Sequence, residues 1–452
     1  MRSQWGSKLG FILATAGSAI GLGNIWRFPY LIAQNGGGAF LLVYLFCVSF
    51  LGYFLLTAKV TFGQIAQTDF IDAFQKVGKK GTSKLWAKFG GFSALFNIFF
   101  VSSVYIIVIS WTLSYVLVGI RNFLGIYPLE INSALFEHLT SSYSLQLFWI
   151  ILCLLISGYI LAKGVKEGIE KISLYLMPIL LCILIFMVVW ISFEPNTGKG
   201  FAYLFYPDWK FLGFTDNGFE WQPFAHLSLL ALGQAIYSLS LGLGVCFIYG
   251  SYLKADIDIK KSTLWVVFLD TCVAILASMI VLPAVFAFDL ESNQGPALSF
   301  VTLPFVFNQM YGGNLLMLTF FILLFFGALT SIISIYEPAI SLLIEKLGLI
   351  RKKATLIVLG TNLALALVIL ASFTGIFNLT IGGKNLFDAV DYLTGTYTMG
   401  LMMLIYCLFM GWKIFPKIAD ELGLKSKIYK SYFKFVLRWL APFVLILLFI
   451  TA

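Results

Sequence analysis

Most of this chain consists of apolar segments long enough to cross a lipid bilayer. A spanning helix needs about 20 mostly apolar residues, and eleven segments approach or exceed that length. They cover residues 8–34, 39–66, 88–120, 146–163, 169–192, 224–252, 262–288, 314–345, 354–377, 387–413 and 433–451. Because 60% of the residues are hydrophobic and only 11% are charged, the sequence predicts an all-α integral membrane protein in a lipid bilayer.

Basic residues gather in alternate loops between these segments. If the N-terminus is cytoplasmic, the loops on that side contain the lysines and arginines of 76–88, 163–171, 254–261, 351–353 and 413–430. The opposite loops contain few bases and several acids, which is the pattern of the positive-inside rule. We therefore expect a multi-pass protein of the cell (inner) membrane with a cytoplasmic N-terminus. Because eleven is odd, the C-terminus would lie outside.

The first and sixth segments are interrupted at mid-depth by small and polar residues. The first contains "GSAIGLGN" at 17–24, and the sixth contains "SLSLGLGV" at 238–245. Unwound backbone in a membrane is tolerated only where it lines a protein-enclosed or wet cavity. Its free carbonyls can coordinate a cation, and half-helix N-termini can hold a carboxylate. Close helix packing through Gly17 and Gly21 is the alternative, but two matched interruptions favour a binding site.

The interruptions also indicate an internal repeat. Each opens a group of five segments, and because five is odd the second group must be inverted relative to the first. We expect a first repeat at 1–192 (helices 1–5), a second at 193–413 (helices 6–10), and an additional helix 11 within 414–452. The stretch 293–310 is too short to span and predicts an extracellular hairpin.

Several function classes are disfavoured. The sequence has no nucleophile–base pattern, P-loop or metal-ligand cluster, so we do not expect an enzyme. The net charge of +9 falls in short clusters without a basic stripe, so we expect no nucleic-acid partner. No obligatory protein partner is evident.

Motifs along nearly the whole chain then identify a family resemblance. "GSAIGLGNIWRFPY", "NGGGAF", "SWTLSY", "KGVKEGIEK", "GQAIYSLSLGLG", "GPALSFVTLPFVF", "FGALTSIISI" and "FDAVDYLTG" resemble the neurotransmitter:sodium symporter family, most closely its bacterial sodium-coupled amino-acid transporters. The resemblance implies a five-plus-five inverted-repeat fold with unwound helices 1 and 6 and, here, eleven transmembrane helices.

The resemblance implies two sodium sites. One, called here the Thr330 site, would use the carbonyls of Gly17, Ile20 and Gly327 and the hydroxyls of Thr330 and Ser331. The other, called the Asn24 site, would use the carbonyl of Ala19, the side chains of Asn24, Ser238 and Asp270, and the substrate carboxylate. That last ligand would couple the binding of ion and substrate.

The resemblance also implies an amino-acid pocket. The carboxylate would meet backbone amides at Gly21–Gly23 and the hydroxyl of Tyr105, which on its own could equally be a packing residue. Ala19 stands where monoamine carriers of the family have an aspartate, so a neutral α-amino acid is expected. The residues expected to line the pocket are Ser18, Ala19, Gly21, Leu22, Gly23, Val101, Tyr105, Tyr237, Ser238, Ser240, Leu243, Ser331 and Ile335.

Two gates are implied in the same way. Arg27 and Asp391 would form an outer ion pair above Tyr105 and Tyr237. Arg2 and Glu345, with Trp5 packed nearby, would form an inner one, although Arg2 alone could be a plain positive-inside anchor.

Two ionisable residues depart from the family pattern. The family usually has glutamate at Lys59 and asparagine at Asp270. Both lie about eight residues from the cytoplasmic end of their segments, at a depth of roughly 12 Å. Equal depth and opposite sign predict a Lys59–Asp270 ion pair, in which the ammonium could replace one of two sodium ions; snorkelling of Lys59 to the surface is the alternative. Chloride-dependent members of the family have serine at the position of Ala274, about one turn after Asp270, and chloride-independent members usually have an acid there. The negative charge of Asp270, from a neighbouring position, therefore favours chloride independence.

The function expected from these features is import of a neutral, hydrophobic or aromatic amino acid by sodium symport through alternating access. The number of sodium ions, one or two, stays open. The alternatives are a transporter-like amino-acid sensor and a substrate-gated sodium conductance.

Overall fold

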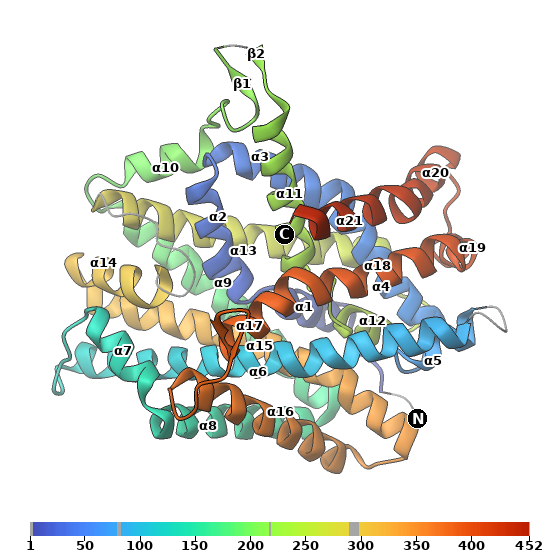
Figure 1. Ribbon diagram of the computed structural model, residues 1–452, viewed down its shortest axis with the longest axis horizontal. Helices are drawn as coiled ribbons and strands as arrows, with labels where there is room; N and C mark the ends of the chain where they lie inside the picture. The colour runs from blue at the N-terminus through green and yellow to red at the C-terminus, as the bar shows by residue number, and fades with distance from the viewer. Residues whose placement is uncertain (1–2, 79–82, 217, 289–297, 452) are drawn as a thin grey trace.

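The computed structural model describes residues 3–78, 83–216, 218–288 and 298–451. Helices dominate because a backbone in lipid must satisfy its hydrogen bonds within its own segment. Within these residues, nine helices are long and apolar enough to cross a membrane, and the bent pair Lys8–Ala19 and Gly23–Gln34 makes a tenth span. Many of these helices run across Figure 1 in a similar direction, with short helices and loops at both ends of the bundle.

The first five spans follow the expected segments closely. Span 1 consists of α1 (Lys8–Ala19), the π-helical turn η1 (Gly23–Arg27) and α2 (Phe28–Gln34). Span 2 consists of α3 (Gly38–Cys47), η2 (Val48–Gly52) and α4 (Tyr53–Ala66). Spans 3 and 4 are α6 (Ser83–Leu124) and α8 (Tyr143–Ala162), and span 5 joins η3 (Val165–Glu170) to α9 (Lys171–Ser192).

The remaining spans form the second half of the chain. Span 6 is divided into α11 (Trp221–Ser238) and α12 (Val245–Ser251). Spans 7, 8 and 9 are α13 (Ile259–Ala287), α15 (Gly313–Leu347) and α16 (Arg351–Phe373). Span 10 consists of α17 (Leu386–Tyr392), η5 (Leu393–Thr398) and α18 (Met399–Trp412), and the last span of α20 (Lys427–Phe435), η6 (Val436–Leu440) and α21 (Ala441–Thr451).

Both predicted interruptions are present in the structure. The two halves of span 1 are bent by 56°, and span 6 is open over residues 239–244. The expected count of eleven spans is not reproduced by length and composition among the described residues, because the sixth span is divided into two shorter helices. The predicted repeat boundaries remain predictions.

Short elements occupy the connections. They are α5 (Asp72–Val77), α7 (Ser133–Ser141), α10 (Gly198–Phe205), η4 (Leu298–Thr302), α14 (Leu303–Gln309), α19 (Phe415–Glu421) and the antiparallel hairpins β1–β2 (Phe214–Thr215, Gly218–Phe219) and β3–β4 (Thr380–Ile381, Lys384–Asn385). Of the predicted hairpin at 293–310, residues 293–297 lie outside the described residues. Residues 298–309 form η4 and α14, and α14 packs against α15.

A carboxylate from span 5 holds the beginning of α1. The Ser7 side chain caps the helix by accepting a hydrogen bond from the Gly10 amide at 2.9 Å. The buried Glu170, at the end of η3, accepts hydrogen bonds from the Ser7 hydroxyl at 2.8 Å and from the Gly6 amide at 2.7 Å. The cap therefore joins the first span to the π-helical start of the fifth.

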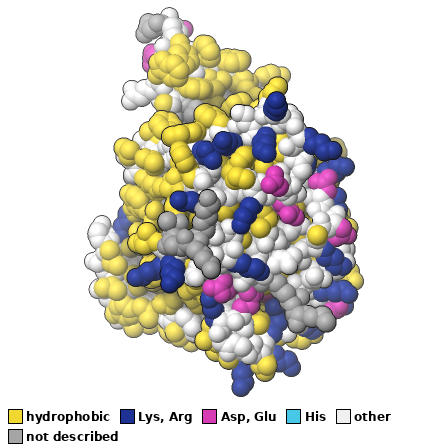
Figure 2. All heavy atoms as spheres, turned by 90° about the vertical axis from the view of Figure 1, so that its right-hand side faces the viewer, with side chains coloured by type: hydrophobic (Ala, Val, Ile, Leu, Met, Phe, Trp, Pro, Cys, Tyr) yellow, Lys and Arg dark blue, Asp and Glu magenta, His cyan; other side chains and the backbone are white. Residues whose placement is uncertain are grey.

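Charged side chains are concentrated at one end of the bundle. Figure 2 shows that end, the right-hand side of Figure 1, where many lysines and arginines lie among fewer acidic residues. The helices α5, α19 and α20 lie on this side of the molecule (Figure 1). This distribution is what the positive-inside rule describes for a cytoplasmic face.

Candidate functional site

The break in span 1 leaves room that only glycine preserves. After α1 ends, Ile20 is extended, with φ −73° and ψ 110°, and helical structure resumes at Gly23. A Cβ atom at Gly21 would lie 2.6 Å from the Tyr105 hydroxyl and 2.7 Å from the Ser331 Oγ. The absence of a side chain at this position therefore keeps open a space between spans 1, 3 and 8.

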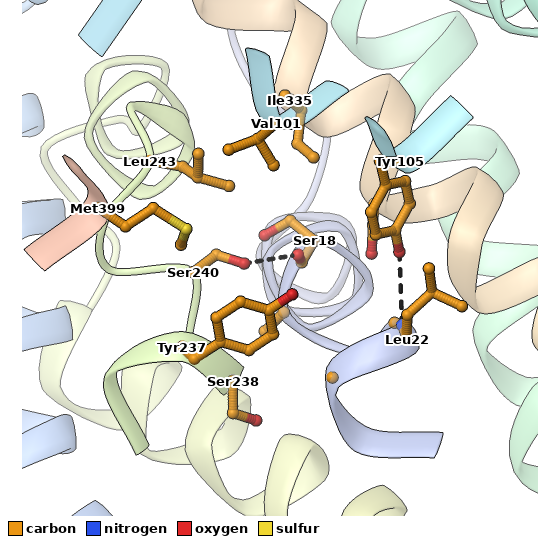
Figure 3. Close-up of a pocket in the computed structure, with 14 residues that line it drawn as sticks. Ser18, Leu22, Val101, Tyr105, Tyr237, Ser238, Ser240, Leu243, Ile335 and Met399 are labelled. Carbon is orange, nitrogen blue, oxygen red and sulfur yellow. Dashed lines mark hydrogen bonds between the residues drawn. The ribbon is translucent and has the colours of Figure 1, made fainter. Parts of the chain in front are cut away.

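The break in span 6 faces the break in span 1. Ser240 has φ +51°, a left-handed conformation that is strained for a residue other than glycine. Its hydroxyl donates a hydrogen bond of 3.0 Å to the carbonyl of Ser18 (Figure 3). The strained residue of one interruption is thus bonded directly to the backbone of the other.

A cavity lies between the two breaks (Figure 3). Every residue that the sequence predicted for the amino-acid pocket lines it, and Met399 is an addition. The lining consists of Ser18, Ala19, Gly21, Leu22, Gly23, Val101, Tyr105, Tyr237, Ser238, Ser240, Leu243, Ser331, Ile335 and Met399.

The cavity has a polar side and an apolar side. On the polar side, the Leu22 amide donates to the Tyr105 hydroxyl at 3.4 Å. Figure 3 shows an apolar group formed by Leu243, Val101 and Ile335, with Met399 beside Leu243. The arrangement can receive a molecule with one polar and one apolar end.

The oxygens of the predicted Thr330 site are gathered beside this cavity. The Ser331 hydroxyl donates to the carbonyls of Gly17 at 3.3 Å and Ile20 at 3.1 Å. The Thr330 hydroxyl donates to the Gly327 carbonyl at 3.0 Å. All of these oxygens are uncharged, and both hydroxyl-bearing residues are buried. An uncharged oxygen cage suits a hard monovalent cation.

The side chains of the predicted Asn24 site also meet. Asn24 donates from Nδ2 to the Ser238 Oγ at 3.0 Å and to the Asp270 Oδ1 at 2.8 Å. The Ser238 hydroxyl donates to the Asp270 Oδ2 at 2.7 Å. All three residues are buried, so spans 1, 6 and 7 bring together an oxygen-rich cluster with a carboxylate. Ala19, whose carbonyl was also predicted here, lines the adjoining cavity.

The predicted Lys59–Asp270 ion pair is wrong for this structure. Lys59 is fully buried and donates from Nζ to the carbonyls of Leu241, at 2.6 Å, and Leu243. Asp270 instead accepts from Asn24 and Ser238. The unpaired carbonyls of span 6 take up the ammonium. Snorkelling to the surface, the alternative for Lys59, is likewise not observed.

The predicted outer ion pair is also not formed. The Arg27 guanidinium lies 4.7 Å from the centre of the Tyr237 ring and donates to the Gln234 Oε1 at 3.1 Å. Among the described residues, no ion pair joins Arg27 to Asp391. The physical reason is that the guanidinium is bound instead by the Gln234 side chain and the face of the Tyr237 ring.

The inner gate is described in part. Trp5 is buried and donates from Nε1 to the Tyr249 carbonyl at 2.9 Å. The Glu345 carboxylate accepts from the Asp69 amide at 2.8 Å and the Thr68 hydroxyl at 3.1 Å. The predicted partner of Glu345, Arg2, lies outside the described residues.

The structure adds polar residues that the sequence analysis did not single out. Gln234 donates to the Gly23 carbonyl at 3.1 Å. The buried Glu337 pairs with Arg351, with Oε2 and Nη2 2.5 Å apart. Asn97 contacts the break of span 6. A polar side chain inside an apolar segment is a signal of function or packing. This signal could have identified Gln234, Glu337 and Asn97, but not Arg351, which lies at the end of its segment. Met399 carried no such signal.

The sequence of this chain matches a known protein family along nearly its whole length. The family model described as the sodium:neurotransmitter symporter family matches residues 2–127 and 121–452. The chain belongs to this family. It is therefore a multi-pass membrane protein, and it belongs to a family whose transport is coupled to sodium.

Individual relatives match this chain over its whole length or nearly so. A protein of Haemophilus influenzae named an uncharacterized sodium-dependent transporter is 32% identical, with 100% of this chain and 98% of that protein covered. The sodium-dependent transporter YhdH of Bacillus subtilis is 31% identical over 99% of this chain and 97% of its own length. The crystal structure of MhsT in complex with L-phenylalanine has 34% sequence identity, a TM-score of 0.87 and complete coverage of both chains. The predicted fold class is confirmed.

Proposed function

We propose that this symporter imports a hydrophobic or aromatic neutral amino acid together with sodium by alternating access. The observation that carries the proposal is the cavity between the breaks of spans 1 and 6, which has backbone amides at one end and Val101, Leu243, Ile335 and Met399 at the other. The similar MhsT structure contains L-phenylalanine. A bulky apolar side chain suits an apolar wall of this kind.

The polar end of the cavity is proposed to hold the amino-acid backbone. The amides near Gly21–Gly23 and the Tyr105 hydroxyl supply donors for the carboxylate. Carbonyls of the two unwound segments supply acceptors for the ammonium. Ala19 supplies no carboxylate of its own, so the substrate must bring the negative charge. This favours an amino acid over a simple amine.

We propose two co-transported sodium ions, one at the Thr330 site and one at the Asn24 site. The alternative with one ion required the Lys59 ammonium beside Asp270, and Lys59 is bound to the carbonyls of span 6. Asp270 would then be a sodium ligand, and the substrate carboxylate would complete the same site. We propose that Arg27 and Asp391 close the outer pathway in another state of the cycle. The inner pathway is proposed to be closed by Glu345 with Arg2 and Trp5.

Sodium binding is expected to be cooperative. Amino-acid binding to the purified protein should depend on sodium with a Hill coefficient between one and two, since this coefficient cannot exceed the number of sites. Asp270→Ala removes a ligand of the Asn24 site and should lower the coefficient to about one. Sodium titrations of both proteins measure this directly. A wild-type coefficient of one, unchanged in the variant, would support a single ion.

A binding screen of the natural amino acids with and without sodium tests the proposed function. We expect the strongest sodium-dependent binding for large apolar or aromatic amino acids, and no change when chloride is replaced by gluconate, because Asp270 already supplies a negative charge. Preference for charged or very polar amino acids would contradict the proposed substrate class. Stimulation by chloride would contradict the proposed chloride independence.

Proteoliposomes distinguish transport from the two other classes of function. A symporter accumulates the amino acid inside vesicles when a sodium gradient is imposed. A sensor binds the amino acid without accumulation, and a substrate-gated conductance carries sodium current in excess of amino-acid flux.

The proposed topology places the basic end of the bundle (Figure 2) in the cytoplasm and Ala452 outside.

A further inference from the structure

We infer that Lys59 is a positioning residue that holds the unwound segment of span 6 and thereby shapes the apolar end of the amino-acid pocket. The inference rests on the proposed function, because it concerns the same cavity. It assigns Lys59 a task other than pairing with Asp270 or standing in for sodium.

The first observation is what the ammonium contacts. Lys59 on α4 is fully buried. Its Nζ donates to the carbonyls of Leu241, at 2.6 Å, and Leu243, and lies 4.7 Å from the centre of the Tyr406 ring. Within the described part of the chain it has no acidic partner. Hydrogen bonds from a charged donor are roughly twice as strong as those between neutral groups. The Lys59 ammonium makes such bonds to two carbonyls that have no partner within a helix.

The second observation is that Asn97 binds the carbonyl between those two. Asn97 on α6 donates from Nδ2 to the Gly242 carbonyl at 3.1 Å and to the Thr398 carbonyl at 3.1 Å. Three consecutive carbonyls of the break, at 241, 242 and 243, are therefore held from outside the cavity by side chains of spans 2 and 3. Such carbonyls would otherwise be unsatisfied in an apolar surrounding, which is strongly unfavourable.

The third observation connects this clamp to the pocket. Gly242 lies so close to span 10 that a Cβ atom there would be 2.4 Å from the Cβ of Met399. Met399 and Leu243, which follows Gly242, both line the cavity (Figure 3). The position of the three carbonyls consequently sets where these two apolar side chains lie. The carboxylate end of the cavity, at Gly21–Gly23 and Tyr105, is formed by other spans.

The test is the ratio of affinities for a large and a small amino acid. Lys59→Met keeps an unbranched apolar side chain and removes the ammonium. In saturating sodium, we expect the purified variant to bind L-phenylalanine about tenfold more weakly while its affinity for L-alanine changes less than about twofold, as loss of a charge-assisted hydrogen bond at one end of the pocket predicts. The sodium concentration for half-maximal binding should stay within about twofold of wild type.

Two further variants make the result specific. Lys417→Met removes another ammonium–carbonyl bond, that of Lys417 to Val77 at 2.7 Å, far from the break in sequence, and should leave the affinity ratio unchanged. Asn97→Ala removes the neighbouring contact without any charge. It should shift the ratio in the same direction as Lys59→Met, and it keeps the inference testable if the lysine variant does not fold.

Three results would overturn the inference. Wild-type affinity ratios in both Lys59→Met and Asn97→Ala would show that the clamp does not shape the pocket. A rise in the sodium Hill coefficient of Lys59→Met would show that the ammonium replaces a cation. Absence of sodium-dependent amino-acid binding in the wild-type protein is a separate outcome, which rejects the proposed function and this inference with it.

Discussion

Thr330→Val is expected to raise the sodium concentration needed for half-maximal amino-acid binding by about 5- to 140-fold. Valine has nearly the shape of threonine but lacks the hydroxyl, so the Thr330 site would lose one of its oxygens while the helix keeps its packing. Loss of one polar partner in a buried site costs about 1–3 kcal/mol, and 1.4 kcal/mol corresponds to a factor of ten. The measurement is L-phenylalanine binding to purified protein over a sodium titration.

Thr319→Val is the matched control for this experiment. Thr319 lies on the same helix, α15, and its hydroxyl also donates to helix carbonyls, those of Leu315 at 2.8 Å and Leu316 at 3.0 Å. It therefore reports the cost of removing a threonine hydroxyl outside the site, and we expect wild-type sodium dependence. Equal shifts in both variants would count against a sodium ion at Thr330.

Gly21→Ala is expected to weaken amino-acid binding about 5- to 140-fold. The added methyl group would lie 2.6 Å from the Tyr105 hydroxyl and 2.7 Å from the Ser331 Oγ, where it displaces both hydroxyls and fills the polar end of the cavity. Overpacking of this kind costs about 1–3 kcal/mol, which gives the stated range. The dissociation constant for L-phenylalanine in saturating sodium measures the effect.

Gly360→Ala provides the comparison. Gly360 also lies in a membrane-spanning helix, α16, but a Cβ atom there would have no neighbour within 4 Å. Binding should be unchanged, and thermal stability should rise slightly because alanine favours a helix more than glycine does. If Gly21→Ala bound L-phenylalanine as tightly as Gly360→Ala, the ligand would have to lie elsewhere.

The sequence predicted the spans and their breaks because both depend on local chemistry. Segment length and apolarity follow from the thickness of the bilayer, and the glycines and serines of 17–24 and 238–245 cannot continue an ordinary lipid-facing helix. The residues lining the cavity were reached differently, by resemblance to a family motif. Their gathering around one cavity agrees with that assignment, while their roles remain proposals.

Side-chain partners were harder to predict than positions along the chain. Lys59 and Asp270 were placed at equal depth, but depth does not determine which way a residue faces around its helix. The Leu241 and Leu243 carbonyls could not be foreseen as partners either, because their direction depends on how the broken span is folded. The same limit applies to Arg27, which contacts Gln234 and Tyr237 on α11 of span 6.

The hydrogen bonds of Glu170 have a mechanical consequence for span 1. The half-helix α1 has 12 residues, so it is a rod about 18 Å long with its pivot at the break near Gly21. A rotation of about 20° at that pivot would move the far tip by about 6 Å, more than twice the length of a hydrogen bond. Gly6 and Ser7 at the tip could not stay bonded to a stationary Glu170 through such a swing. These two hydrogen bonds would therefore have to break in such a rotation, and they stabilise the position of α1 seen in this structure.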